Sequence, residues 1–239
     1  MDEGDHQSAA AVNAPLTTLL MTFEKSGPAQ WLGHLDVMRA FERGLRRAGV
    51  PIALTQGHNP RSRLRFVFPA GVGLIAWADI VFVDILGSAD AVSAECVNAC
   101  MPVGIRIIGV AVPDPKTLAE GPTRFSLADY RITLSVPPDT DANLGAIAAE
   151  SLMAAAESPL NRVSDARTRI LDVRPFIEGA TCVAVRDGRA VFCIRTRFGN
   201  AGTVRPGELA ELLSRCLPGA ELLLMERMRL LTHERDTAS

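Results

Sequence analysis

The sequence predicts an α+β fold made of two ferredoxin-like halves in tandem, each with an antiparallel sheet. The first observation is the order of patterned segments between residues 16 and 113, which is strand-helix-strand-strand-helix-strand. The second is that the same order restarts between residues 129 and 232. The third is the stretch 114–128, which contains prolines and no hydrophobic period and is therefore interpreted as a linker. Residues 1–15 and 233–239 are expected to be a disordered leader and a disordered tail.

The first half opens with a strand over residues 17–24, in which apolar and polar residues alternate. A helix is expected from about residue 34 to residue 48, because apolar residues recur there every three to four positions. These residues are Leu35, Met38, Phe41 and Leu45. Gly49 and Pro51 would end the helix, since a glycine suits a left-handed cap and a proline cannot continue a helix.

Three strands and a second helix complete this half. An alternating strand is expected over residues 61–68 and a nearly continuous apolar strand over 78–86, as in the inside of a sheet. A capped helix should lie between residues 88 and 100, followed by a strand over 105–112. Both helices of such a half pack on one face of its sheet.

The second half shows the same pattern with weaker spacing. Its elements are expected at residues 130–136 (strand), 141–157 (helix), 181–185 and 190–197 (strands), 206–217 (helix) and 220–231 (strand). The pair Asp187-Gly188 between two of these strands is a two-residue hairpin turn, and Pro206 suits the first turn of a helix. Residues 169–177 are either a short strand or a bridging segment.

Composition and charge exclude several classes of protein. The 239 residues are 48% hydrophobic and 22% charged, which is ordinary for a globular chain. A formal net charge of -2 argues against non-specific coating of nucleic acid but leaves room for a local basic site. No apolar run reaches the roughly 18 residues that a membrane span needs. The first fifteen residues are acidic and rich in alanine, unlike a signal peptide.

The strongest local charge lies between Lys25 and Arg65, where eight basic residues accompany two acids. In the strand expected at 61–68, alternation places Arg61, Arg63 and Arg65 on one face. If the opposite face packs on the helices, these guanidinium groups line the open sheet face, where they could bind phosphates bidentately. The alternative is that they are solvated charges that protect an edge strand from pairing.

The same region carries a resemblance to a known family. GPAQWLGHLD at residues 27–36, RAFERGLRRAG at 39–49 and QGHNP at 56–60 follow one another in the order and spacing of the radical-SAM-associated domain of unknown function, DUF2344. LDVRPFI at 171–177 and TVRPGEL at 203–209 are similar to later landmarks of that family. The chain resembles a divergent member.

Some positions depart from the family pattern. His58 replaces the aromatic residue that usually precedes Asn59, and Leu74 and Ile75 replace a small polar residue. The acid-aromatic pair that usually follows is not evident between Trp77 and Asp79. These departures leave open whether the ligand has changed.

The resemblance implies a radical SAM enzyme as partner, fused or encoded nearby. The chain has no CxxxCxxC run to hold a radical SAM cluster, so it would not perform that chemistry alone. S-adenosylmethionine, the iron-sulfur cluster and cobalamin would belong to the partner enzyme, and no cofactor is expected in this chain. Its five cysteines lack a metal-ligand pattern, so we expect no metal site and interpret them as reduced thiols of a cytoplasmic protein.

Several residues are candidates for a site. His34 and His58 are weak catalytic candidates, although each is also compatible with capping, packing or turn chemistry. The candidates for binding a ligand or RNA are Arg39, Arg43, Gln56, His58, Asn59, Arg61, Arg63, Arg65 and Arg205. The last of these ends GNAGTVRP, a loop before a helix that could hold an anion or be a flexible connection.

Three functions are compatible with these observations. The first is an accessory module that presents a substrate, most plausibly RNA, to a separate cobalamin-dependent radical SAM enzyme. The second is a stand-alone enzyme that processes or modifies RNA and uses His34 or His58 for acid-base chemistry. The third is a protein-interaction module without nucleic acid, whose arginine stripe Arg39, Arg43 and Arg47 docks on an acidic partner.

Overall fold

A computed structural model of the chain describes residues 15–164 and 167–232. The described chain has a mixed α+β structure with five α-helices and mostly antiparallel sheet pairing. It divides into two compact units. Unit 1 holds described residues 15–72 and 78–124, and unit 2 holds residues 73–77 together with those from 125 onward. The predicted leader 1–15 and tail 233–239 lie outside the described residues, apart from Pro15.

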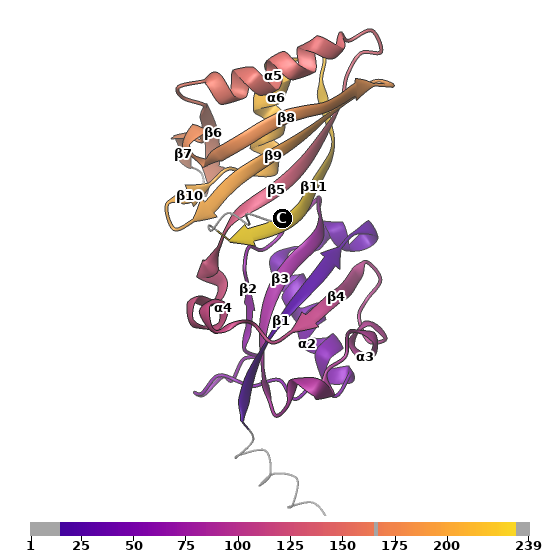
Figure 1. Cartoon of the computed structure of the whole chain (residues 1–239), viewed down its shortest axis with the longest axis vertical. Coiled ribbons are helices and arrows are strands. Elements are labelled where there is room, and N and C mark those ends of the chain that lie inside the picture. Colours follow the sequence, from indigo (N-terminus) through magenta and orange to yellow (C-terminus); the bar gives the residue numbers. More distant parts are fainter. Residues whose placement is uncertain (1–14, 165–166, 233–239) are drawn as a thin grey trace, which may run out of the picture. The chain divides into compact units, whose positions relative to one another are not determined.

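Unit 1 follows the predicted order of elements (Figure 1). Its elements are β1 (Leu16–Lys25), α2 (His34–Arg47), β2 (Leu64–Phe66), β3 (Leu74–Leu86), α3 (Ala94–Asn98), β4 (Ile105–Ala111) and α4 (Pro115–Glu120). The strand order across its sheet is β2-β3-β1-β4. The first residues of β3, before Ala78, belong to unit 2.

Helix α2 closes the core of unit 1 against the central strands. It buries Val37, Phe41 and Leu45 in a cluster with residues of β1 and β3. The predicted apolar face is therefore only partly right: Leu35 is 58% exposed and Met38 is half-buried. Positions 37, 41, 44 and 45 follow the helical period more closely, and they, not position 35, face the sheet.

Strand β2 is shorter than the predicted strand at 61–68. Leu64–Phe66 pairs with β3 opposite residues 81–83, and backbone hydrogen bonds of Arg63 and Val67 continue the contact with β3 by one residue on each side. Before it, Ser62 forms a bridge with Leu54, so residues 54–62 fold back on themselves as a small hairpin. The alternation itself is as predicted, because Leu64 and Phe66 pack against the core while Arg65 lies on the other side of the strand.

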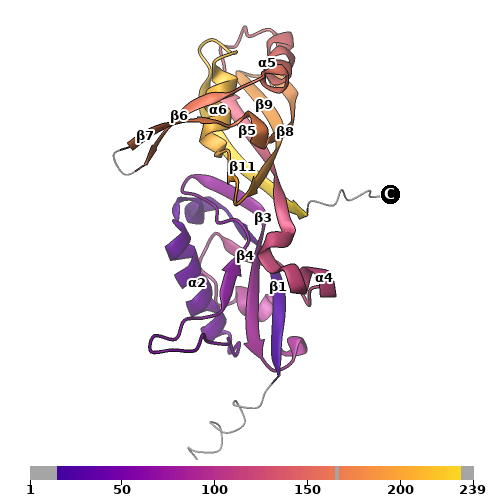
Figure 2. The same ribbon diagram turned by 90° about the vertical axis from the view of Figure 1, so that its left-hand side faces the viewer.

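The predicted linker at 114–128 contains regular elements that its sequence pattern did not indicate. It contains α4, a short 3-10 helix (Gly121–Arg124) and the start of the next strand. Asp114 caps α4 by accepting hydrogen bonds from the backbone and hydroxyl of Thr117, which is why a proline-bearing segment without a hydrophobic period is still ordered. Figure 2 shows α2 and α4 on opposite sides of the strands of unit 1.

Unit 2 repeats the strand order of unit 1 with two insertions. Its elements are β5 (Phe125–Ser135), α5 (Ala142–Ala154), β6 (Pro159–Ser164), β7 (Arg167–Asp172), β8 (Ile177–Arg186), β9 (Arg189–Gly199), β10 (Gly202–Thr203), α6 (Pro206–Ser214) and β11 (Glu221–Thr232). The main strands lie in the order β8-β9-β5-β11, and each neighbouring pair is antiparallel. The segment predicted at 169–177 ends the inserted hairpin β6-β7.

Helices α5 and α6 cover one face of the sheet of unit 2. Tyr130, Ile132, Phe192 and Ile194 point to that face and are buried. The approach of α5 is close, since a Cβ built on Gly145 would lie 2.5 Å from Sγ of Cys182. Outward positions of the same strands carry Asp129, Arg131, Arg195 and other charged residues. Among the helices of the described residues, none is long and apolar enough to cross a membrane.

Candidate nucleic-acid interface

Two of the three arginines predicted to line an open sheet face are held by one buried acid. Asp84, whose side chain is 1% exposed, accepts from Nε of Arg63 at 2.9 Å and from Nη2 of Arg65 at 3.0 Å. Thr18 donates its hydroxyl to the same carboxylate at 2.8 Å. A buried carboxylate is costly without cationic partners, so Arg63 and Arg65 first serve to neutralise Asp84.

The face that carries Asp84 is also covered within unit 1. The guanidinium of Arg65 lies 5.5 Å above the ring of Phe82, and a Cβ built on Gly121 would approach its Nη1 to 3.3 Å. Gly121 follows α4 with φ 58° and ψ -140°, a conformation that favours glycine. The chain after β4 therefore crosses the sheet face that the sequence suggested was open.

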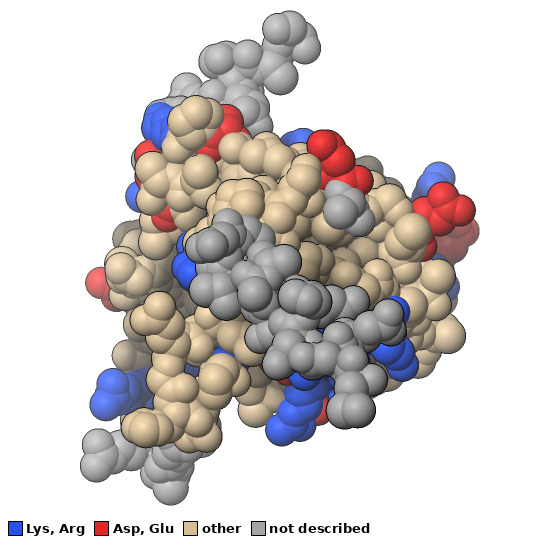
Figure 3. Space-filling view, turned by 90° about the horizontal axis from the view of Figure 1, so that it is seen from below, with Lys and Arg blue, Asp and Glu red and all other residues tan. Residues whose placement is uncertain are grey.

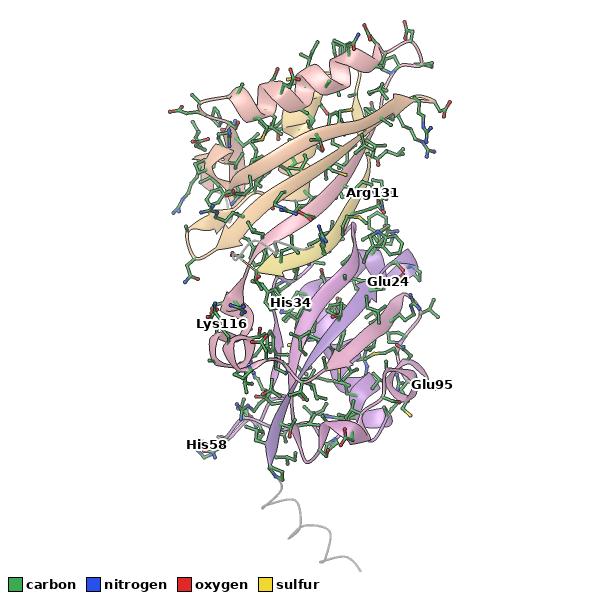
Figure 4. All side chains as sticks on the ribbon, viewed as in Figure 1. Glu24, His34, His58, Glu95, Lys116 and Arg131 are labelled. Atoms are coloured by element: carbon green, nitrogen blue, oxygen red, sulfur yellow. The ribbon has the colours of Figure 1, made fainter. Side chains whose placement is uncertain are left out.

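The hairpin at residues 54–62 presents the predicted polar ligands to solvent. Gln56, His58 and Asn59 are all exposed at its tip. The backbone of Thr55 donates to the carbonyl of Arg61, and the Arg61 backbone donates to the Thr55 hydroxyl, so the base of the hairpin is fixed. Figure 4 shows His58 projecting away from the strands of unit 1.

One arginine of α2 contacts this hairpin. Arg46 donates to the Ser62 hydroxyl at 3.3 Å, which ties the end of the helix to the hairpin, and Arg47 donates to the carbonyl of Cys100. Arg39 differs because it pairs with Asp36 one turn earlier, at 3.4 Å. We call Arg43, Arg46, Arg47 and Arg61 the basic surface: all four are exposed, and among the described residues none has a carboxylate within ion-pair distance.

His34 is exposed and borders a small cavity next to two buried polar residues, away from the hairpin. With Lys25, Asp79 and Phe66 it lines a cavity of about 10 Å³, which is roughly the room that one water needs. Lys25 is fully buried and its ammonium donates to the carbonyls of Gln30, Leu32 and Gly71.

The His34 ring meets Phe66 edge-on at 5.3 Å. Among the described residues, no carboxylate accepts a hydrogen bond from His34 or His58. The two histidines, the weak catalytic candidates, thus occupy different places in unit 1 (Figure 4).

Arg205, the remaining predicted binding residue, lies in unit 2 at the start of α6. Its backbone N–H donates to the Glu208 carboxylate at 2.7 Å, and the Arg162 guanidinium donates two further hydrogen bonds to the same carboxylate. A side chain of the protein therefore takes the place at which the loop was expected to hold an anion. Within the described residues there is also no cluster of metal-ligating side chains, and all five cysteines are free thiols.

The sequence reasoning missed a charged network on the sheet face of unit 2. Asp129 of β5 accepts two hydrogen bonds from Arg195 of β9, at 2.7 and 2.9 Å, and one from Arg229 of β11, at 2.9 Å. Burial alone would raise the pKa of Asp129, but the hydrogen bonds and charges of the two arginines outweigh it and hold the pKa below its usual value. The sequence signal that could have revealed this network is the set of charged residues at the outward-facing positions of the alternating strands.

Two further ion pairs lie next to this network. Glu226 accepts from Arg131 at 2.7 Å and from the indole of Trp77 at 2.8 Å. Glu178 of β8 accepts from Arg197 at 2.6 Å. Arginine side chains thus occupy outward positions of three neighbouring strands.

The fold is a mixed α+β architecture, and the sequence places the chain in a family. The chain belongs to the family described as "Uncharacterized protein conserved in bacteria (DUF2344)", whose sequence profile matches residues 18–206. The predicted resemblance is therefore confirmed at the level of the family. No curated protein matches the chain.

Solved structures provide a likeness in fold. A chain of a crystallised Cbf5-Nop10-Gar1 complex matches with a TM-score of 0.52 at 9% identity, covering 89% of this chain and 48% of that one. A chain of an archaeal box H/ACA sRNP Nop10-Cbf5 complex matches with a TM-score of 0.44 at 10% identity, covering 87% and 46%. The chain spans about half the length of these structures.

Proposed function

We propose that this chain is an accessory module that binds RNA and presents it to a separate, cobalamin-dependent radical SAM enzyme. The observation that carries the RNA-binding part is the basic surface: four exposed arginines of unit 1 without carboxylate partners among the described residues. The partner enzyme is implied by the family resemblance alone. The proposed place of action is the cytoplasm.

RNA fits this surface better than a structural role does. Guanidinium groups bind phosphate oxygens through paired N–H donors, and exposed arginines without a carboxylate partner keep donors for that purpose. The hairpin adds neutral donors and acceptors at Gln56, His58 and Asn59, which could contact bases or sugars. In the space-filling view from below, the visible Lys and Arg side chains are scattered over the face instead of joining in one belt (Figure 3).

The proposal includes the division of the chain into two ferredoxin-like halves, at residues 16–113 and 129–232. The equivalent strand orders β2-β3-β1-β4 and β8-β9-β5-β11 support it. Sheet-based halves of this type leave one sheet face for ligands, but a likeness in fold does not by itself name the ligand.

Binding of a structured RNA to the full chain tests this function. We expect Arg43, Arg46, Arg47 and Arg61, changed together to alanine, to weaken binding at least tenfold in a fluorescence anisotropy titration, because phosphate contacts dominate such affinities. A matched control changes four other exposed arginines to alanine: Arg106, Arg186, Arg189 and Arg215. Equal weakening by both variants would show that only net charge matters and would contradict the proposed surface.

The presenting role needs a separate observation. A tagged full-length chain should retain the radical SAM enzyme encoded beside it when both are purified at low salt. RNA binding without any retained enzyme would remove the presenting part of the proposal and leave an RNA-binding protein.

A further inference from the structure

The sheet face of unit 2 contains a hollow that the basic surface does not include. It measures about 540 Å³, within the roughly 300 to 1,000 Å³ typical of small-molecule sites. Asp129, Glu178, Arg195 and Arg229 line it, together with Thr181 and other residues of β8 and β9. Both described helices of unit 2 lie on the other face of the sheet (Figure 1), so no described helix of this unit covers the hollow.

Two strand irregularities build the charged rim of this hollow. On β11 the register shifts between Arg227 and Arg229, and the shift places Arg229 opposite Asp129. On β8 it shifts between Ile177 and Gly179, and the extra residue is Glu178. A bulge re-aims one side chain and is common beside functional sites. Each bulge thus adds one charged group to the network on the central strands.

The charges in and beside the hollow favour an anion. Three guanidinium groups, those of Arg195, Arg197 and Arg229, face the two carboxylates of Asp129 and Glu178. Among the described residues of this group, one positive charge is therefore in excess. Arg229 contacts Asp129 through its Nε, and its side chain is 58% exposed, which leaves its terminal nitrogens available to a ligand.

Next to these arginines, the hollow is bounded by a glycine, which has no side chain. Gly179 is directly opposite Arg195 on the neighbouring strand, so a side chain at this position would share the face of the hollow. A Cβ built on Gly179 meets no atom within 4 Å. The missing side chain leaves room for a flat group next to the Arg195 guanidinium, a plane on which nucleobases stack.

We propose that this hollow binds one phosphate-bearing nucleotide unit, with the phosphate on Arg229 and the base beside Arg195 and Gly179. This inference rests on the proposed RNA-binding function and assigns a second contact to it. The nucleotide belongs either to the RNA strand or to a free mononucleotide, since the same phosphate and base are present in both. Asp129 acts as a positioning residue that holds both arginines.

Isothermal titration of the full chain with uridine monophosphate, adenosine monophosphate, inorganic phosphate and a single-stranded hexanucleotide tests the site. We expect Arg229→Ala and Gly179→Leu each to weaken mononucleotide binding at least tenfold, the first by removing the anion contact and the second by filling the space. The control Arg215→Ala removes an exposed arginine directly after α6 and should leave binding unchanged. A hexanucleotide that binds much more tightly than the mononucleotides identifies the strand as the source.

Three results would overturn the proposal. They are no saturable mononucleotide binding at low salt, equal binding by native protein and both variants, and inorganic phosphate binding as tightly as the mononucleotides. Failure of this site is distinguishable from failure of the proposed function, because the variant lacking the basic surface keeps the hollow. That variant should bind mononucleotides normally even if RNA no longer binds.

Discussion

The two units use the same device, one aspartate between two arginines, in different surroundings. In unit 1, Asp84 is 1% exposed and receives Arg63 and Arg65 under the segment that includes α4 and Gly121. In unit 2, Asp129 is 19% exposed and receives Arg195 and Arg229 on a sheet face that no described helix of that unit covers. The arginines of the two clusters are similarly exposed, so the difference between the clusters lies in the burial of the aspartate and not in that of the guanidinium groups.

The largest expected difference between the Asp84 and Asp129 clusters is in their contribution to the free energy of unfolding. Changing Arg63 and Arg65 together to alanine leaves Asp84 buried without a cation, so the free energy of unfolding should fall by about 3 kcal/mol. Changing Arg195 and Arg229 should cost about 1 kcal/mol or less, since Asp129 can be hydrated. Urea unfolding followed by circular dichroism measures both. Equal decreases in the free energy of unfolding would contradict the proposed difference between the Asp84 and Asp129 clusters.

Substitutions at two glycines compare the covered Asp84 cluster with the open sheet face of unit 2. Gly121→Ala should lower the free energy of unfolding by roughly 1 to 2 kcal/mol, because residue 121 adopts a glycine conformation and its Cβ would press on Arg65. Gly179→Ala on the open face should change it by about 0.5 kcal/mol or less, since nothing lies within 4 Å. Thermal unfolding of both variants gives the comparison, and a larger loss at Gly179 would contradict it.

The smallest effect is the response of Asp129 to pH. Because its pKa is lowered in the folded protein, its charged form stabilises the fold above the unfolded value of about 3.9, and this contribution disappears as pH falls through the folded pKa. Asp129→Asn lacks the contribution. The stability difference between native protein and variant should therefore be largest at neutral pH and shrink below about pH 4. A difference that stays constant from pH 7 to pH 2 would show that the ion pairs do not stabilise the fold.

Local periodicity predicted most of the secondary structure. The alternation in β1, β5 and β9 and the turn at Asp187-Gly188 appear in the structure, because each depends on neighbours in sequence. The helix α4 was missed because its stability comes from the Asp114 cap and not from a hydrophobic period. The hairpin β6-β7 was missed because its strands pair with each other outside the main sheet.

The candidate site was predictable only in part. The sequence correctly placed Arg63 and Arg65 on the strand face away from the core, but their partner Asp84 lies in a strand that reads as continuously apolar. Whether a guanidinium is free depends on such long-range pairs. The Asp129 network forms because β9, β5 and β11 are neighbouring strands and β11 contains a bulge. The sequence of a single strand does not specify which strands it pairs with or in which register.

The most direct test of RNA binding by the basic surface is the salt dependence of the affinity. For a single-stranded RNA, the slope of log K against log salt is negative, and its magnitude should decrease by about 0.7 for each phosphate contact removed. The magnitude of the slope should therefore be about 3 smaller for the variant lacking Arg43, Arg46, Arg47 and Arg61 than for the native chain, with the control variant unchanged. A native slope near zero, or the same slope in all three proteins, would contradict RNA binding by this surface.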